Sequence, residues 1–189
     1  MKRSTVEHSS MGLVVVNFGS SDLIRTNLSD VLAAFPAVVV DNFTSTDEQV
    51  RVADLAAEAG ADVIRSPTNS GFGEAVNRGV GQLIERGVER VLLVNPDVHV
   101  SEQQVLHLSS VSASDPDAIM SPIILNGIGQ TWFRGGVLDR HRIVATHADP
   151  TGPDVELDWL TGACLLVPAA AWRQLGGFSS DYFLYWEDV

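Results

Sequence analysis

Short runs of branched apolar residues alternate with amphipathic stretches through the first two-thirds of the chain. The apolar runs lack polar alternation, which is typical of strands covered on both faces; they are LVVVN (13–17), AVVVD (37–41), ADVIR (61–65) and VLLVN (91–95). The stretches between them have helical periodicity and cover residues 21–35, 47–60 and 72–87. This order predicts an α/β, Rossmann-like domain, with a mostly parallel sheet flanked by helices.

The pattern changes in the last third of the chain. Ser101 and Gln104 resemble a capping box for a further helix. We expect another strand at 117–125, a β-hairpin at 129–147, a turn-rich loop at 150–153, a strand at 156–167 and a short helix at 168–176. The prediction is therefore an N-terminal segment (1–11) that need not be ordered, followed by one domain (12–189) with halves 12–125 and 126–189.

Composition narrows the class of protein. Hydrophobic residues make up 45% of the chain and the mean hydropathy is +0.12, which favours a globular protein over a disordered one. No apolar run approaches the roughly 18–20 residues that span a bilayer. The net charge of −12 argues against binding nucleic acid by general electrostatics. The single cysteine, Cys164, cannot form an internal disulfide, which favours a reducing cytoplasm. It lies in an apolar run, which favours a buried, inert thiol.

Polar side chains end all four apolar runs. They are Asn17, Asp41 with Asn42, Arg65 leading to Asn69, and Asn95 with Asp97. Ligands of open α/β sheets bind beyond the carboxyl ends of the strands, so these residues predict a site for a polar ligand at that edge.

The stretch PTNSGFGEAVNRG (67–79) supports a ligand site next to the third amphipathic stretch. Gly71 and Gly73 permit close approach of a ligand to the backbone, and the first turn of a helix suits an anion. Asn77 lies one turn further on. The alternative is a plain glycine turn before a helix. A dinucleotide fingerprint is excluded, because it belongs after the first strand, where this chain has NFGSSD.

The stretch VNPDVHV (94–100) places a carboxylate directly after a buried strand and a proline. Asp97 is therefore suited to bind a divalent cation through oxygen, and the alternative is that it caps a turn. His99 is interpreted as an ordinary strand residue rather than a second ligand.

Together these segments resemble glycosyltransferase family 2, inverting enzymes of GT-A fold, and are most similar to its bacterial rhamnosyltransferase-like members. The segments that carry the resemblance are VVVNFGSSD (14–22), VVVDNFTSTD (38–47), NSGFGEAVNRG (69–79), LLVNPDV (92–98), LTGACLLV (160–167) and FLYWEDV (183–189). LLVNPDV stands where the family has its D-x-D motif, and Glu187-Asp188 where it has an acidic pair.

The resemblance implies a role for each matching position. The donor nucleotide would be bound by Asn17, Asp41, Asn42, Asn69, Gly71, Asn77 and Asn95. Asp97 would hold Mg²⁺ or Mn²⁺ against the donor diphosphate. Asp188 would take the proton of the acceptor hydroxyl, and Glu187 would position donor or acceptor. The acceptor or sugar pocket would include Gly162, Ala163, Tyr185 and Trp186; core packing is the alternative for Phe183 and Trp186.

The implied function is transfer of a hexose-type sugar from a dTDP- or UDP-sugar, with dTDP-rhamnose as one candidate, to a glycan or lipid-linked acceptor with inversion. The enzyme would act in the synthesis of a cell-surface polysaccharide. It would be cytoplasmic, and peripheral association with the inner face of the membrane and a homo-oligomer are both compatible with the sequence.

Two departures from the family pattern leave an alternative open. Asn95 replaces the first Asp of D-x-D, so Asp97 alone supplies a full charge there. Relatives continue past the acidic pair, so the sequence also fits an incomplete or non-catalytic nucleotide-sugar-binding domain. A sugar nucleotidyltransferase is disfavoured, because NFGSSDLIR lacks the glycine-rich loop with Arg and Lys that this class requires.

Overall fold

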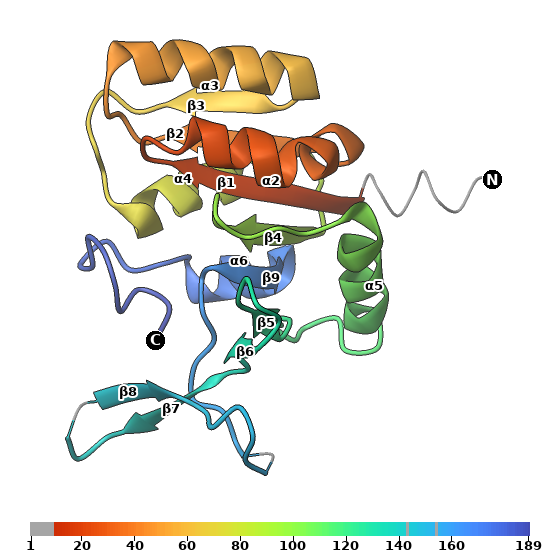
Figure 1. Cartoon of the computed structure of the whole chain (residues 1–189), viewed down its shortest axis with the longest axis vertical. Coiled ribbons are helices and arrows are strands. Elements are labelled where there is room, and N and C mark those ends of the chain that lie inside the picture. Colours follow the sequence, from red (N-terminus) through yellow and green to blue (C-terminus); the bar gives the residue numbers. More distant parts are fainter. Residues whose placement is uncertain (1–9, 143, 154) are drawn as a thin grey trace.

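The computed structural model describes residues 10–142, 144–153 and 155–189. Its largest sheet has five strands, and helices lie on both sides of it (Figure 1). The strands are β1 (Met11–Asn17), β2 (Ala37–Asp41), β3 (Asp62–Arg65), β4 (Arg90–Val94) and β9 (Cys164–Pro168). Their order across the sheet is β3-β2-β1-β4-β9. The first four are parallel and β9 is antiparallel to β4. The predicted α/β fold with a mostly parallel sheet is confirmed.

Within the described residues, helices cover both faces of this sheet (Figure 1). They are α2 (Ser21–Ala34), α3 (Thr46–Ala59), α4 (Phe72–Glu85), α5 (Glu102–Ser112) and α6 (Ala169–Leu175). Successive strand residues point to opposite faces. Leu13 and Val15 therefore pack into one cluster with α2, α3 and α5, whereas Val14 packs into a second cluster with α4. Burial on both faces explains why the strand sequences are apolar without alternation.

Helix ends follow the signals in the sequence. Ser45 caps α3 by accepting a hydrogen bond from the backbone N–H of Glu48, and Gly60 ends that helix in the left-handed conformation. Ser101 and Gln104 form the expected capping box at the start of α5. No helix within the described ranges is both long and apolar enough to cross a membrane.

Three predictions for the last third need correction. Of the expected strand 117–125, only Met120, which bridges to Leu166, and β5 (Ile124–Leu125) pair with other residues. Pro122 interrupts the stretch because it has no N–H to donate to a ladder. The expected hairpin 129–147 is divided: β6 (Thr131–Phe133) pairs with β5, and β7 (Gly136–Asp139) pairs with β8 (Val144–His147).

The third correction concerns the expected strand 156–167. The regular ladder begins only at Cys164, which pairs with Val94, the last residue of β4. Residues 156–163 lack this partner because the chain turns at Asn95-Pro96, and the last contact is the N–H of Asn95 to the carbonyl of Ala163 at 2.9 Å. Of the expected segment 1–11, residues 1–9 lie outside the described residues, and Met11 is buried in β1.

Helix α4 packs tightly against the sheet at one glycine, which gives a first prediction. A Cβ atom on Gly79 would lie 2.6 Å from Val14 Cγ1 and 3.0 Å from Val40 Cγ2. We expect Gly79→Ala to lower the free energy of unfolding by about 1–2 kcal/mol, because overpacking outweighs the gain in helix propensity. Urea denaturation measures this change.

Gly81, in the same helix, is the matched control. A Cβ there would meet nothing within 4 Å. Gly81→Ala should therefore stabilise the protein by about 0.5–1 kcal/mol. Equal effects of the two substitutions would contradict the packing of α4 against β1 and β2.

Candidate functional site

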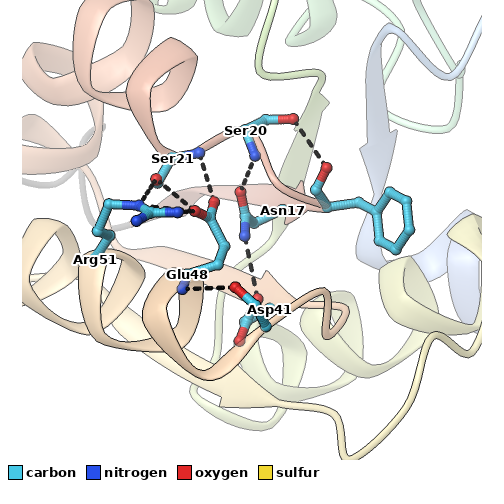
Figure 2. A network of polar contacts seen from close by, with 8 residues as sticks. Asn17, Ser20, Ser21, Asp41, Glu48 and Arg51 are labelled. Carbon is cyan, nitrogen blue, oxygen red and sulfur yellow. Dashed lines mark hydrogen bonds and ion pairs between the residues drawn. The ribbon is translucent and has the colours of Figure 1, made fainter.

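The parallel register of β1 and β2 places Asn17 beside Asp41 at the carboxyl edge of the sheet. Both side chains are fully buried, and Asn17 Nδ2 donates a hydrogen bond to Asp41 Oδ1 at 3.1 Å (Figure 2). Asp41 Oδ2 is buried and has no hydrogen-bond partner within the described part of the chain. Since buried polar atoms are normally paired, this oxygen can accept a hydrogen bond from a ligand.

A buried glutamate that the sequence interpretation missed lies next to this pair. Glu48, in the first turn of α3, is 3% exposed. Its carboxylate accepts hydrogen bonds from Ser21 and from Arg51 (Figure 2). Burial acts to raise the pKa of Glu48, but these bonds outweigh it, so the pKa lies below its usual value. The available signal was Glu48 and Arg51 spaced i, i+3 on the helix face that also carries Val52.

Asn42 holds the loop that precedes α4. Its Nδ2 donates to Asn69 Oδ1 at 2.8 Å and to the carbonyl of Gly71 at 3.0 Å. Its Oδ1 accepts from the N–H of Ser70 at 2.9 Å, and Asn69 Oδ1 also accepts from the N–H of Gly71. The side chains of Asn42 and Asn69 therefore shape this loop, in addition to any contact with a ligand.

The C-terminal segment docks onto the first turn of α4. Gly71 has φ +87°, and the next residue, Phe72, donates its N–H to the carbonyl of Phe183 at 3.1 Å. A Cβ on Gly71 would lie 2.3 Å from that carbonyl oxygen, so glycine is required here for close approach. One N–H of the first turn is thus taken by the chain itself, where the sequence suggested an anion.

Asn77 has a partner that the sequence did not suggest. Its Nδ2 donates to the carbonyl of Phe178 and its Oδ1 accepts from the N–H of the same residue, both at 2.9 Å. This pair of bonds ties α4 to the chain 101 residues later. Asn77 thus orients the segment that leads to the acidic pair.

The two carboxylates of the acidic pair differ in environment. Asp188 Oδ2 accepts a hydrogen bond from the N–H of Gly162 at 2.8 Å. Glu187 lies beside Gly73, and its Oε2 is buried without a partner among the described residues. Burial, and in addition the negative charge of Asp188, raise the pKa of Glu187. Burial likewise raises the pKa of the nearby Cys164 thiol to about 12, which agrees with an inert cysteine.

The aromatic residues before the acidic pair are exposed. Phe183 is 58% and Trp186 is 41% exposed, so the alternative of core packing for these two residues is wrong. Tyr185 and Trp186 have φ of +66° and +69°, in the left-handed region that bulky residues rarely adopt. Strained backbone conformations of this kind are concentrated at active sites and ligand-binding segments.

A cleft of about 1110 Å³ opens beside this segment. Four predicted site residues line it together: Asn95, Asp97, Ala163 and Tyr185. Its other walls are mainly apolar and come from residues 98–100, α5, residues 122–127 and Trp132. Asp97 is exposed, and no group of three or more His, Cys, Asp or Glu side chains gathers into a metal site within the described ranges.

Contacts connect the predicted residues along the carboxyl edge of the sheet. Asn42 follows the Asn17–Asp41 pair and donates a hydrogen bond to the carbonyl of Gly71. The two residues after Gly71 contact the C-terminal segment: Phe72 bonds to the carbonyl of Phe183, and Gly73 lies beside Glu187. Asp188 contacts Gly162, and Ala163 contacts Asn95, which leads to the cleft and Asp97. Trp186, although part of the same segment, does not line the cleft.

Comparison with protein-family models finds no match. Among curated proteins, the chain is 24% identical to the low-salt glycan biosynthesis hexosyltransferase Agl10 of Haloferax volcanii over 185 residues, 95% of this chain and 59% of the relative. It is 30% identical to an N-acetylglucosaminyl-diphospho-decaprenol L-rhamnosyltransferase of Mycobacterium tuberculosis over 152 residues, 64% of this chain and 48% of the relative.

Solved structures with the same fold include TarS and PcManGT. S. aureus TarS (1–349) in complex with UDP matches with TM-score 0.61 and 18% identity, over 95% of this chain and 52% of that one. The mannosyltransferase PcManGT from Pyrobaculum calidifontis, in complex with GDP-Man and Mn²⁺, matches with TM-score 0.55 and 15% identity, over 91% and 48%. The chain thus spans about half the length of its relatives, and the resemblance to glycosyltransferases is confirmed.

The raised pKa of Glu187 gives a second prediction. Its value exceeds the ordinary 4.5, so the stabilisation from the protonated form is present below pH 4.5 and is lost as pH rises through the pKa of the folded protein. Glu187→Gln should therefore gain stability relative to the unaltered protein between pH 4 and pH 7. Urea denaturation at the two pH values measures this change.

The exposed Glu85 in α4 provides the control, since Glu85→Gln removes a carboxylate that the fold does not bury. Its stability relative to the unaltered protein should change little between the two pH values. A constant difference for Glu187→Gln as well would contradict a buried, uncompensated Glu187.

Proposed function

We propose that this chain, a relative of the family 2 glycosyltransferases, transfers a sugar from a nucleotide-sugar donor to a glycan or lipid-linked acceptor with inversion. The observation that carries the proposal is the buried pair of Asn17 and Asp41, which leaves one carboxylate oxygen for a ligand at the sheet edge. Contacts join that edge to two further carboxylates, Glu187 and Asp188. The two glycosyltransferase relatives support the same assignment.

Asp41 is the proposed contact to the donor nucleoside. An ionised carboxylate only accepts hydrogen bonds. Its free oxygen therefore suits an N–H of the nucleobase or a hydroxyl of the ribose. Uracil and thymine carry such an N–H, in agreement with a UDP- or dTDP-sugar. TarS, which has the same fold, was solved in complex with UDP, and this supports a nucleotide as the ligand.

Asp97 is the proposed protein ligand of Mg²⁺ or Mn²⁺. Its exposed carboxylate suits a hard cation, and Mg²⁺ is commonly bound by one or two carboxylates together with substrate phosphates. One protein carboxylate is thus a sufficient contribution, with Asn95 beside it. The cation would neutralise negative charge on the leaving diphosphate. The Mn²⁺ in the complex of PcManGT supports a divalent ion.

Asp188 is the proposed general base. In an inverting transfer, the acceptor oxygen forms a bond to the anomeric carbon while the bond from that carbon to the diphosphate oxygen breaks. The acceptor proton passes to a carboxylate on the face opposite the leaving group. The hydrogen bond from Gly162 to Asp188 Oδ2 supports this role, because it fixes the carboxylate and leaves Oδ1 to take the proton. Glu187, beside it, would position donor or acceptor.

The cleft beside Asp97 is the proposed acceptor site. Tyr185 and Ala163 lie on its wall, and its apolar lining suits a sugar face or the first part of a lipid. The relative named for a diphospho-decaprenol substrate supports a lipid-linked acceptor. Such an acceptor would bring the chain to the inner face of the membrane, from the cytoplasm.

The proposed cation site gives a third prediction. Asp97→Ala should weaken binding of UDP in the presence of Mn²⁺ by about tenfold or more and leave binding of uridine unchanged, because only the diphosphate meets the cation. Isothermal titration with UDP, dTDP and GDP, each with and without Mn²⁺, measures the effect. Asp30→Ala, an exposed substitution in α2, is the control. Equal Mn²⁺ dependence in Asp97→Ala would rule out this ligand.

The proposed base gives a fourth prediction. Asp188→Asn keeps an oxygen for the N–H of Gly162 but cannot take a proton at neutral pH. Transfer or donor hydrolysis should therefore fall by 10²-fold or more, within the range of roughly 10²–10⁴ for general-base catalysis. Binding of UDP should stay within about twofold.

Turnover by the unaltered chain and by Asp188→Asn can be compared by release of nucleoside diphosphate from a panel of nucleotide sugars. Turnover that survives in Asp188→Asn would exclude Asp188 as the base. UDP binding without turnover by the unaltered chain would instead favour the second candidate, a domain that binds the nucleotide sugar without transferring the sugar.

A further inference from the structure

Glu48 supplies a helix cap that the local sequence of α2 lacks. The N-cap residue of α2, Ser20, makes no side-chain capping bond. Instead the N–H of Ser21 donates to Glu48 Oε1 at 2.9 Å, and Ser21 Oγ donates to Glu48 Oε2 at 3.0 Å. A carboxylate at this end of a helix is favourable, because the free N–H groups there carry partial positive charge. A residue from α3 thus caps α2 (Figure 2).

Arg51 completes the contacts of this carboxylate. Its Nε and Nη2 donate to Glu48 Oε2 at 2.9 and 2.6 Å. The Glu48 side chain is 4% exposed, whereas that of Arg51 is 54% exposed. A buried charge is tolerated when it is paired and hydrogen-bonded, and Glu48 meets both conditions. The carboxylate is therefore a fixed point between α2 and α3, held from the solvent side by a guanidinium.

A short path of hydrogen bonds leads from Glu48 to Asp41. Ser20, adjacent to the capped Ser21, donates its N–H to Asn17 Oδ1 at 2.9 Å. This bond fixes which end of the Asn17 amide is which, so that Nδ2 faces Asp41 Oδ1. The reversed amide would place two donors together at Ser20 and two acceptors together at Asp41. The free oxygen of Asp41 is thus oriented by the turn that Glu48 holds.

We infer that Glu48 is a positioning residue of the donor site, which fixes the turn from Asn17 to Ser21 and thereby the orientation of Asp41 toward the nucleoside. The inference rests on the proposed function for its ligand. The contacts that carry it, however, lie within the protein, so the orientation of the Asn17 amide can be tested without any nucleotide.

The first experiment measures that orientation directly. NMR spectra of ¹⁵N-labelled protein report the side-chain amide of Asn17 and the backbone amides of Ser20 and Ser21. Glu48→Ala should shift all three signals and accelerate hydrogen exchange at Ser21. Glu58→Ala is the matched control, because it also removes a glutamate of α3 that contacts α2, in this case through an exposed ion pair with Arg25. An unchanged Asn17 side-chain signal in Glu48→Ala would overturn the inference.

The second experiment measures the consequence for binding. Glu48→Ala should weaken binding of uridine and UDP by a similar factor, about fivefold to tenfold, because the effect reaches the nucleoside through Asp41. Glu48→Gln keeps an oxygen for Ser21 and should lose less. Affinities are measured well below the melting temperature of each variant, so loss of stability alone would leave them unchanged, as expected for Glu58→Ala.

A double-mutant cycle separates positioning from an independent effect. Asp41→Asn keeps an acceptor for Asn17 but replaces the free oxygen with a donor. If Glu48 acts through Asp41, Glu48→Ala should weaken uridine binding much less in the Asp41→Asn background than in the unaltered protein. Fully additive losses would overturn the inference.

The NMR comparison and the binding measurement also test this inference separately from the proposed function. If the unaltered protein binds none of UDP, dTDP or GDP, the proposed function fails, and the NMR comparison still decides whether Glu48 orients Asn17. If nucleotides bind and Glu48→Ala binds them as tightly as the unaltered protein does, the positioning role fails while the proposed function stands.

Discussion

The candidate site depends on two buried polar side chains at the end of neighbouring parallel strands. Because β1 and β2 are in register at Asn17 and Asp41, the fold must satisfy an amide and a carboxylate without water, and it does so only in part. Leaving a buried acceptor unpaired costs on the order of 1–3 kcal/mol. A ligand that donates to Asp41 Oδ2 would recover this cost. The hydrogen bonds of the surrounding loops hold the pair in that state.

Hydrogen bonds dock the C-terminal segment, and the ring of Phe178 also packs against Phe72 and Trp172. The carbonyl of Phe183 accepts from α4, Asn77 holds both backbone groups of Phe178, and Gly162 holds Asp188. The later rings, of Phe183, Tyr185 and Trp186, are exposed, and Tyr185 and Trp186 have positive φ. Packing of these rings into an apolar core would also fix the segment. The rings would then be buried and unable to contact a sugar or a lipid.

The sequence predicts the elements of the first two-thirds and the strand-end residues of the site, because both follow from local periodicity. It does not predict partners that tertiary structure supplies. Asn77 is predicted as a nucleotide-binding residue, and the sequence gives no sign of its hydrogen bonds to Phe178, 101 positions away. Glu48 is a charged helix residue, which usually faces solvent, and only its position between two helix ends makes it buried. The strand expected at 117–125 is interrupted at Pro122, which has no backbone N–H to donate to a neighbouring strand. The pattern of apolar residues does not reveal this missing donor.

Under the proposed function, the negative charge of the protein affects the two parts of the donor, the diphosphate and the nucleoside, differently. The protein carries a net charge of −12, and the acidic pair and Asp97 lie along one connected edge, so a diphosphate entering there would meet repulsion. Arg78, in α4, already donates hydrogen bonds to Ser66 Oγ and to the carbonyl of Arg65 at the end of β3. Under the proposed function, we expect a positive charge to enter together with the diphosphate. A divalent ion held by Asp97 would supply this charge, whereas an uncharged nucleoside at Asp41 would need only a hydrogen bond.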